Sequence, residues 1–337
     1  MGILAQCFGR SASAAKSSSI IEDLCPRFSL AQLRKFTNNF DPGRAITGEF
    51  GKLYKGSLDG GSDDTILILP ANSSYKKETA LLCQLRHPNL VSFIGFCNDK
   101  KNETMLVYEY LSNRSLHDHL HRNYEYGSME PLLWKKRLEI CVGIARGLHY
   151  LHTGAKRPIF HCDINPRNIL LDKNWVPKIA NLWISLKGPK FSSKPKPIMA
   201  NHIRGTQRYM APEYAKNGIV TDKVDVYSFG VLLLDVLCAK KSEDQHVENG
   251  SGFWKEKALV EKVSNFVEAG KAGEIIDQCL EGKIAPECLE LFIDIAERCM
   301  LFVPAERPFI GEVEVELERA LALQQEADER ENGYYRI

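Results

Sequence analysis

The stretch His161-Cys162-Asp163-Ile164-Asn165-Pro166-Arg167-Asn168 decides the fold, because it stands in a definite order among other short strings. Before it come residues 46–56 (ITGEFGKLYKG), 86–91 (RHPNLV) and 106–110 (LVYEY). After it come residues 205–206 (GT), 211–213 (APE), 225–230 (DVYSFG) and 307–308 (RP). A lone glycine-rich string would be weak evidence for any fold, whereas an ordered series of this length is strong evidence.

The apolar pattern around these strings changes along the chain. Strand-like runs dominate the first third, at residues 45–56, 66–69, 90–97 and 105–110, with one helical pattern at 76–85. Helical periodicity follows at 116–120, 132–151, 225–237, 257–268, 285–299 and 311–325. In the last of these we expect Val313, Leu317, Ala320 and Leu321 to face the core, and the acids Glu312, Glu314, Glu316 and Glu318 to face solvent. Strands followed by helices predict an α+β fold with two lobes.

Composition excludes several classes of protein. The 337 residues contain 44 Lys and Arg against 43 Asp and Glu, so the formal net charge is +1 and we expect no nucleic-acid partner. The longest apolar run, 231–239, is far shorter than a membrane span and is interrupted by Asp235. The ten cysteines include no C-x-x-C pair and no zinc-type spacing, which is typical of reduced thiols in a cytosolic protein.

Together the strings resemble the protein-kinase signature set over roughly residues 28 to 323. Their wording is most similar to plant receptor-like kinases, in particular the FERONIA-like malectin-receptor group, and the layout resembles a receptor-like cytoplasmic kinase. The resemblance implies a small strand-rich N-lobe at about 28–112 and a large helical C-lobe at about 113–323. The serine-rich residues 1–27 are expected to form a flexible tail, and residues 324–337 a C-terminal tail.

Three charges that a kinase uses are absent at the matching positions. In the family that the chain resembles, a phosphate-binding lysine stands where this chain has Leu69, and it pairs with an acid that matches Glu78. A magnesium-binding aspartate of the family stands where this chain has Asn181. A third charged residue of the family, a lysine that neutralises the transferring phosphoryl group, stands where this chain has Asn165. Phosphoryl transfer depends almost entirely on such positioned charges, and hard cations prefer charged oxygen ligands. The sequence therefore predicts a kinase fold with impaired chemistry, a pseudokinase.

Three uncharged changes accompany these losses. Cys162 replaces the arginine that would bind a phosphorylated activation segment. Trp183 replaces a glycine next to the phosphates, where we expect the indole to compete for space. Ile46 replaces the first glycine of the phosphate loop. Lys52 or Lys55 of the neighbouring strand is an alternative source of the missing lysine, as in some atypical kinases.

Other positions keep the kinase pattern. Asp163 matches the proton acceptor, although without its partners a purely structural role is the alternative, and Asn168 matches the second metal ligand. Glu213 and Arg307 match a buried ion pair, and Asp225 matches the acid that braces the catalytic loop. The remnants of a nucleotide site, besides the positions already named, are Gly48, Gly51, Leu53, Glu109 and Leu111.

The expected function is that of a scaffold, regulator or decoy that binds active receptor-like kinases or other signalling proteins. The alternative is a weak serine/threonine kinase that uses Asp163 and Asn168. We expect no required cofactor and no metal site, and only weak ATP binding that magnesium barely changes. The hydroxyl-rich segment 185–206 and the serine-rich tail are the candidate sites for phosphorylation by another kinase.

The N-terminus resembles a lipidation signal. Gly2 follows Met1 and Cys7 lies close by, as in paired myristoylation and palmitoylation, although Gln6 stands where Ser or Thr is usual. Two acyl chains anchor a protein stably, whereas one is marginal. The expected location is the cytoplasmic face of the plasma membrane, or the cytoplasm if neither chain is added.

Overall fold

The computed structural model describes residues 25–48, 51–58, 66–71, 79, 81–98, 104–121, 130–189, 197–239, 265, 269 and 274–334. The chain forms two compact units, of which the first comprises 1–87 and 91–111, and the second 88–90 and 112–337. The boundary after Leu111 lies one residue from the expected one. Residues 88–90 join the second unit because Asn89 hydrogen-bonds there. Its side chain donates to the carbonyl of Pro177 at 3.0 Å, and its own carbonyl accepts from the amide of Ile179 at 2.9 Å.

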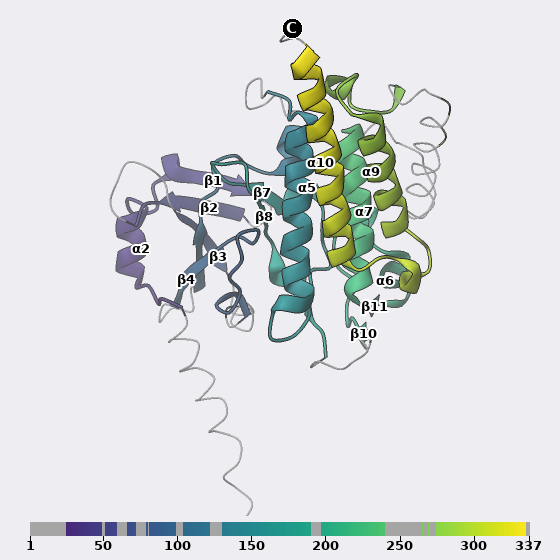
Figure 1. Ribbon diagram of the computed structural model, residues 1–337. Coiled ribbons are helices and arrows are strands. Elements are labelled where there is room, and N and C mark those ends of the chain that lie inside the picture. Colours follow the sequence, from purple (N-terminus) through teal and green to yellow (C-terminus); the bar gives the residue numbers. More distant parts are fainter. Residues whose placement is uncertain are drawn as a thin grey trace, which may run out of the picture. The chain divides into compact units, whose positions relative to one another are not determined.

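The first unit is built on an antiparallel sheet in the order β1-β2-β3-β5-β4 (Figure 1). Its strands are β1 (Ala45–Gly48), β2 (Gly51–Gly56), β3 (Ile66–Ala71), β4 (Phe93–Asn98) and β5 (Thr104–Glu109). Helix α2 (Leu30–Phe36) starts at a capping box between Ser29 and Gln32. Its buried Leu33 packs in a core cluster with Ile66, Ile68, Cys97, Met105 and Val107. The strand expected at 66–69 is confirmed.

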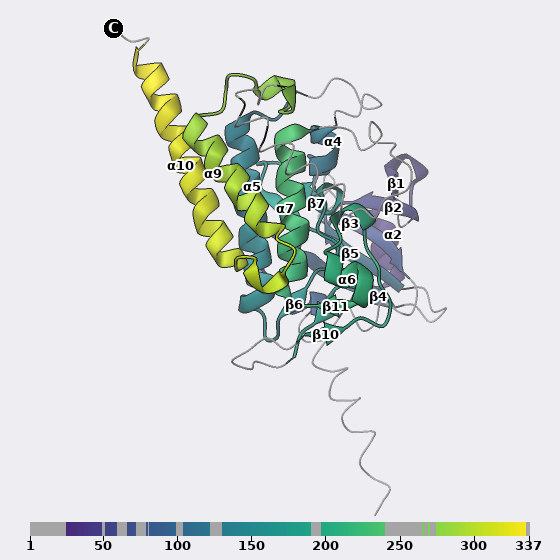
Figure 2. The same ribbon diagram turned by 90° about the vertical axis from the view of Figure 1, so that its right-hand side faces the viewer.

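Four long helices form the frame of the second unit. They are α5 (Trp134–His149), α7 (Asp222–Cys238), α9 (Pro286–Cys299) and α10 (Ile310–Tyr334). Both views show them side by side (Figures 1 and 2), and α10 packs on α5 and α9 while α7 packs on α9. Residues 223–238 of α7 are all buried, so this helix is the centre of the unit.

Short helices and short strand pairs connect the loops of the second unit to this frame. The helices are α4 (Leu116–Leu120) and α6 (Pro212–Asn217). The strand pairs are β6 (Ile159–Phe160) with β9 (Leu186–Lys187), β7 (Ile169–Leu171) with β8 (Pro177–Ile179), and β10 (Ile198–Met199) with β11 (Ile219–Val220). The loop at 161–168 therefore leaves one strand pair and enters the next. Its two ends are fixed by backbone pairing.

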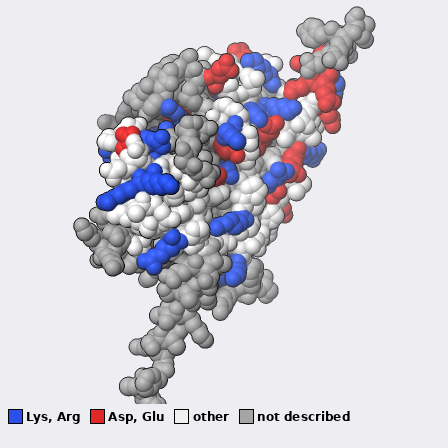
Figure 3. Space-filling model, turned by 90° about the vertical axis from the view of Figure 1, so that its left-hand side faces the viewer, with Lys and Arg blue, Asp and Glu red and all other residues white. Residues whose placement is uncertain are grey.

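The last helix differs from the expectation in two ways. It continues past residue 323 to Tyr334, because Gln324 is buried and hydrogen-bonds both the amide of Ala285, at 2.9 Å, and the carbonyl of Lys283, at 3.1 Å. Of the acids expected to face solvent, Glu312 and Glu318 are exposed, and Glu318 pairs with Arg146 at the surface. Glu314 and Glu316 are instead half-buried in ion pairs with other helices, Glu314 with His149 and Arg146, and Glu316 with Arg298. Val313, Leu317 and Ala320 are fully buried, as predicted, whereas Leu321 is only half-buried. Figure 3 shows further acidic side chains gathered beside the C-terminal end of the chain.

Parts of the expected pattern lie outside the described residues. These parts are residues 76–78 and 80 of the helix expected at 76–85, all of the helix expected at 257–268 except residue 265, the tail before Cys25, and residues 190–196 of the hydroxyl-rich segment. In the described part of the chain, no helix combines the length and apolar character needed to cross a membrane. The nine cysteines in that part are all free thiols.

Candidate functional site

The loop at 161–168 is held by Asp225 of α7. One carboxylate oxygen of Asp225 accepts from the backbone amide of His161 at 2.8 Å, and the other accepts from the amide of Cys162 at 2.8 Å. The ring of His152 lies 2.8 Å from the same carboxylate. Asp225 is fully buried, so these contacts replace the water that an ionised carboxylate would otherwise need. Asp225 therefore fixes the backbone at the start of the loop.

Cys162 occupies a strained position in this loop. Its φ of 66° is in the left-handed region, and its backbone amide is held by Asp225. Burial raises the pKa of the Cys162 thiol, and the charges of Asp225 and Asp163 raise it further. The side chain is therefore a neutral thiol with its sulfur 3.5 Å from the carbonyl oxygen of Phe160. A neutral buried thiol cannot perform the charge pairing of the arginine that it replaces.

The carboxylate of Asp163 accepts hydrogen bonds from both sides. One oxygen accepts from the amide and the hydroxyl of Thr206, each at 2.8 Å, and from Asn165 Nδ2 at 3.1 Å. The other oxygen accepts from Asn168 Nδ2 at 2.9 Å. Asn165 Nδ2 also reaches the hydroxyl of Thr206 at 3.2 Å. Asn165 thus joins the loop to the segment that carries Thr206, but it brings no positive charge.

Asn168 and Asn181 are bonded to each other. Asn168 directs its Nδ2 at Asp163, and its Oδ1 accepts from Nδ2 of Asn181 at 3.1 Å. The Oδ1 of Asn181 is buried without a hydrogen-bond partner. Asn181 has the left-handed backbone angles φ 68° and ψ 53°, which asparagine adopts at low cost. The three side chains form one directed chain, from Asn181 through Asn168 to Asp163.

This pair does not fit a magnesium site. Mg²⁺ requires near-octahedral oxygen ligands and is bound in proteins through carboxylates. Here the two amides contribute no charge, and the oxygen of Asn168 is already used by the NH₂ group of Asn181. Among the residues that the structure describes, no three His, Cys, Asp or Glu side chains are grouped as metal ligands. We therefore derive no catalytic step through a metal at this position.

Trp183 follows this chain on the turn η6 (Leu182–Ile184). Its side chain is 40% exposed. The guanidinium carbon of Arg204 lies 5.9 Å from the centre of the indole ring. The Arg204 backbone is held by Tyr214, whose hydroxyl donates to the carbonyl of Arg204 at 2.9 Å and accepts from its amide at 3.0 Å. Trp183 thus contacts the later part of the 182–206 segment.

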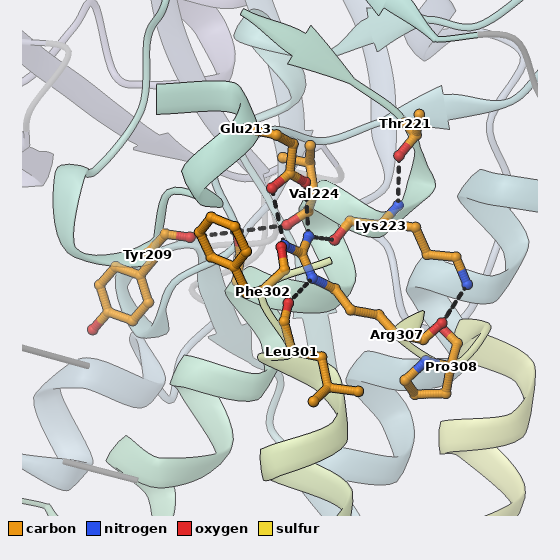
Figure 4. A network of polar contacts seen from close by, with 10 residues as sticks. Tyr209, Glu213, Thr221, Lys223, Val224, Leu301, Phe302, Arg307 and Pro308 are labelled. Carbon is orange, nitrogen blue, oxygen red and sulfur yellow. Dashed lines mark hydrogen bonds and ion pairs between the residues drawn. The ribbon is translucent and has the colours of Figure 1, made fainter. Parts of the chain in front are cut away.

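The buried ion pair expected between Glu213 and Arg307 is present (Figure 4). The guanidinium of Arg307 donates to the two oxygens of Glu213 at 2.7 and 2.9 Å, a bidentate arrangement. It also donates to the carbonyls of Leu301 and Lys223 at 2.8 and 2.9 Å. The side chain of Arg307 is fully buried, so these partners neutralise and solvate its charge. Together they fix α6 to the start of α10.

The remaining predicted site residues lie in the first unit. Gly48 pairs with Gly51 at the β1–β2 turn, and Leu69 stands opposite Leu106 in the β3–β5 ladder. The side chain of Glu109 accepts from the amide of Ser92 at 2.7 Å. Leu53 and Leu111 are half-buried. Glu78, Gly2 and Cys7 lie outside the described residues.

The two alternative lysines contact aromatic rings within the first unit. The Nζ of Lys55 lies 4.8 Å from the ring centre of Tyr110, and that of Lys52 lies 5.7 Å from Tyr54. Each ammonium is therefore placed against a ring face, a contact that stabilises a cation.

Sequence reasoning missed two residues of the supporting frame. Buried Arg137 of α5 donates to the carbonyl of Val236 at 2.6 Å and to the carboxylate of Asp277 at 2.5 Å. Buried Lys223 donates to the carbonyls of Arg307 and Pro308 at 2.7 and 2.9 Å. Their partners are far away in the sequence, and the local pattern of a charged residue in an amphipathic helix gives no sign of burial. No local signal could have identified them.

Comparison with known proteins agrees with this geometry. Residues 45–317 match the family model of protein tyrosine and serine/threonine kinases. The chain is 41% identical over 327 residues to the receptor-like protein kinase ANXUR2 of Arabidopsis thaliana, covering 95% of this chain and 36% of that protein. It is 39% identical over 326 residues to the receptor-like protein kinase FERONIA of the same plant, covering 94% of this chain and 35% of that protein.

The chain spans about a third of the length of these curated relatives. The ordered strings, the strand-rich first unit, the helical second unit and the loop braced by Asp225 all agree with the matched family. The resemblance drawn from the sequence is confirmed, and the chain belongs to the protein kinase family, with receptor-like kinases of the FERONIA and ANXUR type as its relatives.

Proposed function

We propose that this chain is a catalytically impaired kinase, a pseudokinase that acts by binding rather than by phosphoryl transfer. The observation that carries the proposal is the directed amide chain, in which Asn181 donates to Asn168 and Asn168 donates to Asp163. Through these hydrogen bonds, the three side chains of the site are bonded to one another. This row of three side chains contains a single carboxylate and no positive charge.

The missing charges matter because each one has a large effect on the rate of phosphoryl transfer. Losing one preorganised electrostatic partner costs about 3 kcal/mol, or a factor of roughly 10²–10³ in rate. At positions 69, 165 and 181 three such charges are absent from the sequence. The three losses are not additive, but a fraction of their sum removes useful turnover. The fold-bearing contacts of Asp225 and Arg307 are kept, so the chemistry is affected and the fold is not.

The second candidate function is a weak serine/threonine kinase. It is favoured by the position of Asp163, whose carboxylate is oriented by four side-chain and backbone donors rather than left mobile. An oriented carboxylate is the one group a proton-acceptor role requires. Its relatives are named kinases, which also supports this candidate.

Incorporation of labelled phosphate separates the two candidates. The purified chain is compared with an Asp163→Ala variant, with ATP and either Mg²⁺ or Mn²⁺. We expect equal, background-level incorporation in both. Incorporation that disappears in Asp163→Ala would contradict the pseudokinase proposal. A triple variant Leu69→Lys, Asn165→Lys and Asn181→Asp serves as the positive comparison, because it restores the three charges.

The partners we propose are active receptor-like kinases or other signalling proteins at the cytoplasmic face of the plasma membrane. The proposal rests on the kinase relatives and on the Gly2 and Cys7 pattern in the sequence. Cells expressing wild type or Gly2→Ala are fractionated, and the wild-type chain is expected in membranes while the variant is soluble. Equal soluble fractions would refute the lipid anchor but leave the pseudokinase proposal standing.

A decoy role is a variant of this proposal that predicts modification by another kinase. The hydroxyl-bearing segment from Ser185 to Thr206 and the serine-rich tail are the proposed acceptors, and Thr206 is exposed. A phosphosite map after incubation with an active receptor kinase tests it. A map with neither region modified counts against the decoy and in favour of a scaffold.

A further inference from the structure

The residues from 173 to 212 carry charge of one sign only. They include eight Lys and Arg and no Asp or Glu, in a chain that has 44 basic and 43 acidic residues as a whole. Three of these cations, Lys190, Lys194 and Lys196, lie outside the described residues. A local excess of one charge attracts groups of the opposite charge, even where the net charge of the chain is close to zero.

The described cations of this run differ in what they contact. Lys178 is buried and donates to a backbone carbonyl at 3.2 Å, and Arg208 pairs with buried Asp235 at 2.6 Å. Lys187 and Arg204 are exposed, and neither has an acidic partner in the described part of the chain. Their charges therefore face solvent.

The acids near this run are engaged by other groups. Asp172, which precedes it, accepts from two backbone amides of its own turn at 2.8 and 2.9 Å. Glu213, which follows it, is held by the guanidinium of Arg307. Asp163 accepts from four donors of the loop and of the segment that carries Thr206. None of the three carboxylates is directed at the exposed cations.

Contacts within the second unit link the exposed cations to one another. Arg157, exposed just before β6, donates through Nε and Nη2 to the carbonyl of Gly188 at 2.9 and 2.6 Å, so its guanidinium contacts the residue next to Lys187. Arg204 lies against the ring of Trp183, four residues before Lys187. Arg157, Lys187 and Arg204 together define what we call the basic face.

Two exposed apolar side chains flank Arg204 in the sequence. Met199 is 67% exposed and Ile203 is 44% exposed. Their backbone is fixed, because Met199 belongs to the β10–β11 ladder and Tyr214 binds both the amide and the carbonyl of Arg204. Met and Arg are enriched in protein interfaces, and a surface that is already ordered loses little entropy when it binds.

We propose that the basic face docks an acidic segment of a partner protein that carries a phosphorylated side chain. The phosphate offers three acceptor oxygens to the planar fork of Arg204, and acidic neighbours of the phosphate complement Lys187 and Arg157. Apolar side chains of the same segment cover Met199 and Ile203. This proposal rests on the binding function given above, and active kinases supply such segments because phosphorylation orders their activation loops.

An anionic membrane is the competing occupant of a basic surface. Lipid headgroups are attracted by the sum of nearby positive charges, so any exposed cation of the face contributes about equally. A guanidinium held on a fixed backbone between two apolar side chains instead suits one phosphate in a peptide. The features around Arg204 therefore favour the peptide.

The test uses a fluorescein-labelled synthetic peptide, rich in glutamate and leucine, with one central phosphothreonine. Its fluorescence anisotropy is measured while the purified full-length chain is added without nucleotide. We expect saturable binding that weakens roughly tenfold for the same peptide without phosphate, and by about as much for Arg204→Ala, since each change removes a charge-assisted pair. Lys187→Ala should weaken it about threefold, as for an exposed ion pair.

Lys173→Ala is the matched control. Lys173 is exposed on the turn between β7 and β8, so its substitution removes the same charge from the same run without touching the basic face. This variant should bind the phosphopeptide as the wild type does. Thermal unfolding of all three variants should match that of the wild type, because the substituted side chains are exposed.

Three results would overturn the proposal. The first is the absence of saturable binding to the wild type. The second is an equal loss in Arg204→Ala and Lys173→Ala, which would show that bulk charge alone attracts the peptide. The third is binding to phosphatidylserine vesicles that Arg204→Ala weakens, without binding of the peptide, which would assign the face to a membrane. No ATP is present, so this test is decided separately from the labelled-phosphate test of the pseudokinase function.

Discussion

At the scale of single residues, the strings that identified the family also predicted which side chains meet. Asp225, Glu213 and Arg307 form the contacts expected from the kinase pattern. The direction of the amide chain could not be predicted, because which end of an asparagine donates depends on neighbours that are distant in sequence. Asn168 and Asn181 matched metal positions by their places in the pattern, whereas the hydrogen bond between them appears only in the fold.

Replacing Asn181 with aspartate should lower the stability of the folded chain and make that stability depend on Mg²⁺. The variant loses the donor to Asn168 Oδ1 and places a carboxylate against that oxygen, which costs about 1–3 kcal/mol. Mg²⁺ would relieve the repulsion between the two oxygens. The midpoint temperature of thermal unfolding of the Asn181→Asp variant should therefore rise with added Mg²⁺, while that of the wild type stays unchanged. Asn201→Asp, an exposed control, should show neither effect. A magnesium response in wild type would contradict the reading of the site.

Neutralising Glu213 should cost far more than neutralising a surface acid. Glu213→Gln leaves the buried Arg307 charge without its counter-charge, and breaking a buried pair in this way costs about 3–5 kcal/mol. Urea unfolding measures the loss. Glu306→Gln is the matched control, because Glu306 is exposed on the adjacent turn η11 (Pro304–Glu306). Equal stabilities of the two variants would show that the pair contributes little.

At the scale of elements, helix and strand positions followed from periodicity, and the end of α10 did not. The helical pattern in the sequence ends at residue 325, yet the helix continues to Tyr334, and within it buried Gln324 hydrogen-bonds the loop before α9. Of the acids that this helix was expected to expose, Glu314 and Glu316 are instead half-buried and pair with His149 and Arg298. Sequence patterns assign a face to water or to protein, but they do not show that charged groups on a neighbouring helix lie opposite.

The link between α5 and the turn η10 (Gln278–Leu280) should be sensitive to acid. Burial raises the pKa of Asp277, but its hydrogen bond to Arg137 and the charge of Arg137 outweigh this, so the pKa lies below its ordinary value. A carboxyl with a depressed folded pKa contributes stability above its unfolded pKa, near 4, and that contribution is lost as pH falls through the folded value. The free-energy gap between wild type and Asp277→Asn should therefore be full at neutral pH and shrink below about pH 4.

Urea unfolding at a series of pH values measures this gap. Glu281→Gln, which changes an exposed acid on the same connection, should give a gap near zero throughout. A constant difference between wild type and Asp277→Asn from neutral to acid pH would mean that the Arg137 pair holds no ionised carboxylate. The other carboxyls of the chain titrate in both proteins, so they cancel in the comparison.

At the scale of the whole molecule, the sequence alone was sufficient to predict the protein family and the division into two units. The limit at Leu111 was placed within one residue, because the change from strand to helix periodicity coincides with it. Residues 88–90 group with the second unit although they lie within the range expected for the N-lobe, since Asn89 hydrogen-bonds Pro177 and Ile179 of that unit. The missing charges at 69, 165 and 181 were visible at once because they are single letters in an ordered series.

The complete chain should bind adenosine about as well as ATP, with little effect of magnesium. Leu69 supplies no donor for a phosphate, and Asn168 with Asn181 offers the metal no charge. Calorimetric titrations of ATP and adenosine, each with and without Mg²⁺, measure the four affinities. The Leu69→Lys, Asn181→Asp double variant should recover a preference for ATP with Mg²⁺. A large stabilisation of wild type by MgATP alone would instead favour the weak-kinase function.

The hydrogen bond from Asn181 to Asn168 also has an evolutionary consequence. A lineage that regained activity by single substitutions would meet the Asn181→Asp step, which breaks this bond and leaves two oxygens facing each other until a cation is held there. Holding that cation productively requires the charges at 69 and 165 as well, so an isolated reversal carries the cost without the benefit. Under the proposed pseudokinase function, this hydrogen bond therefore makes a stepwise gain of catalysis costly, because the Asn181→Asp step is unfavourable until the other two charges are present.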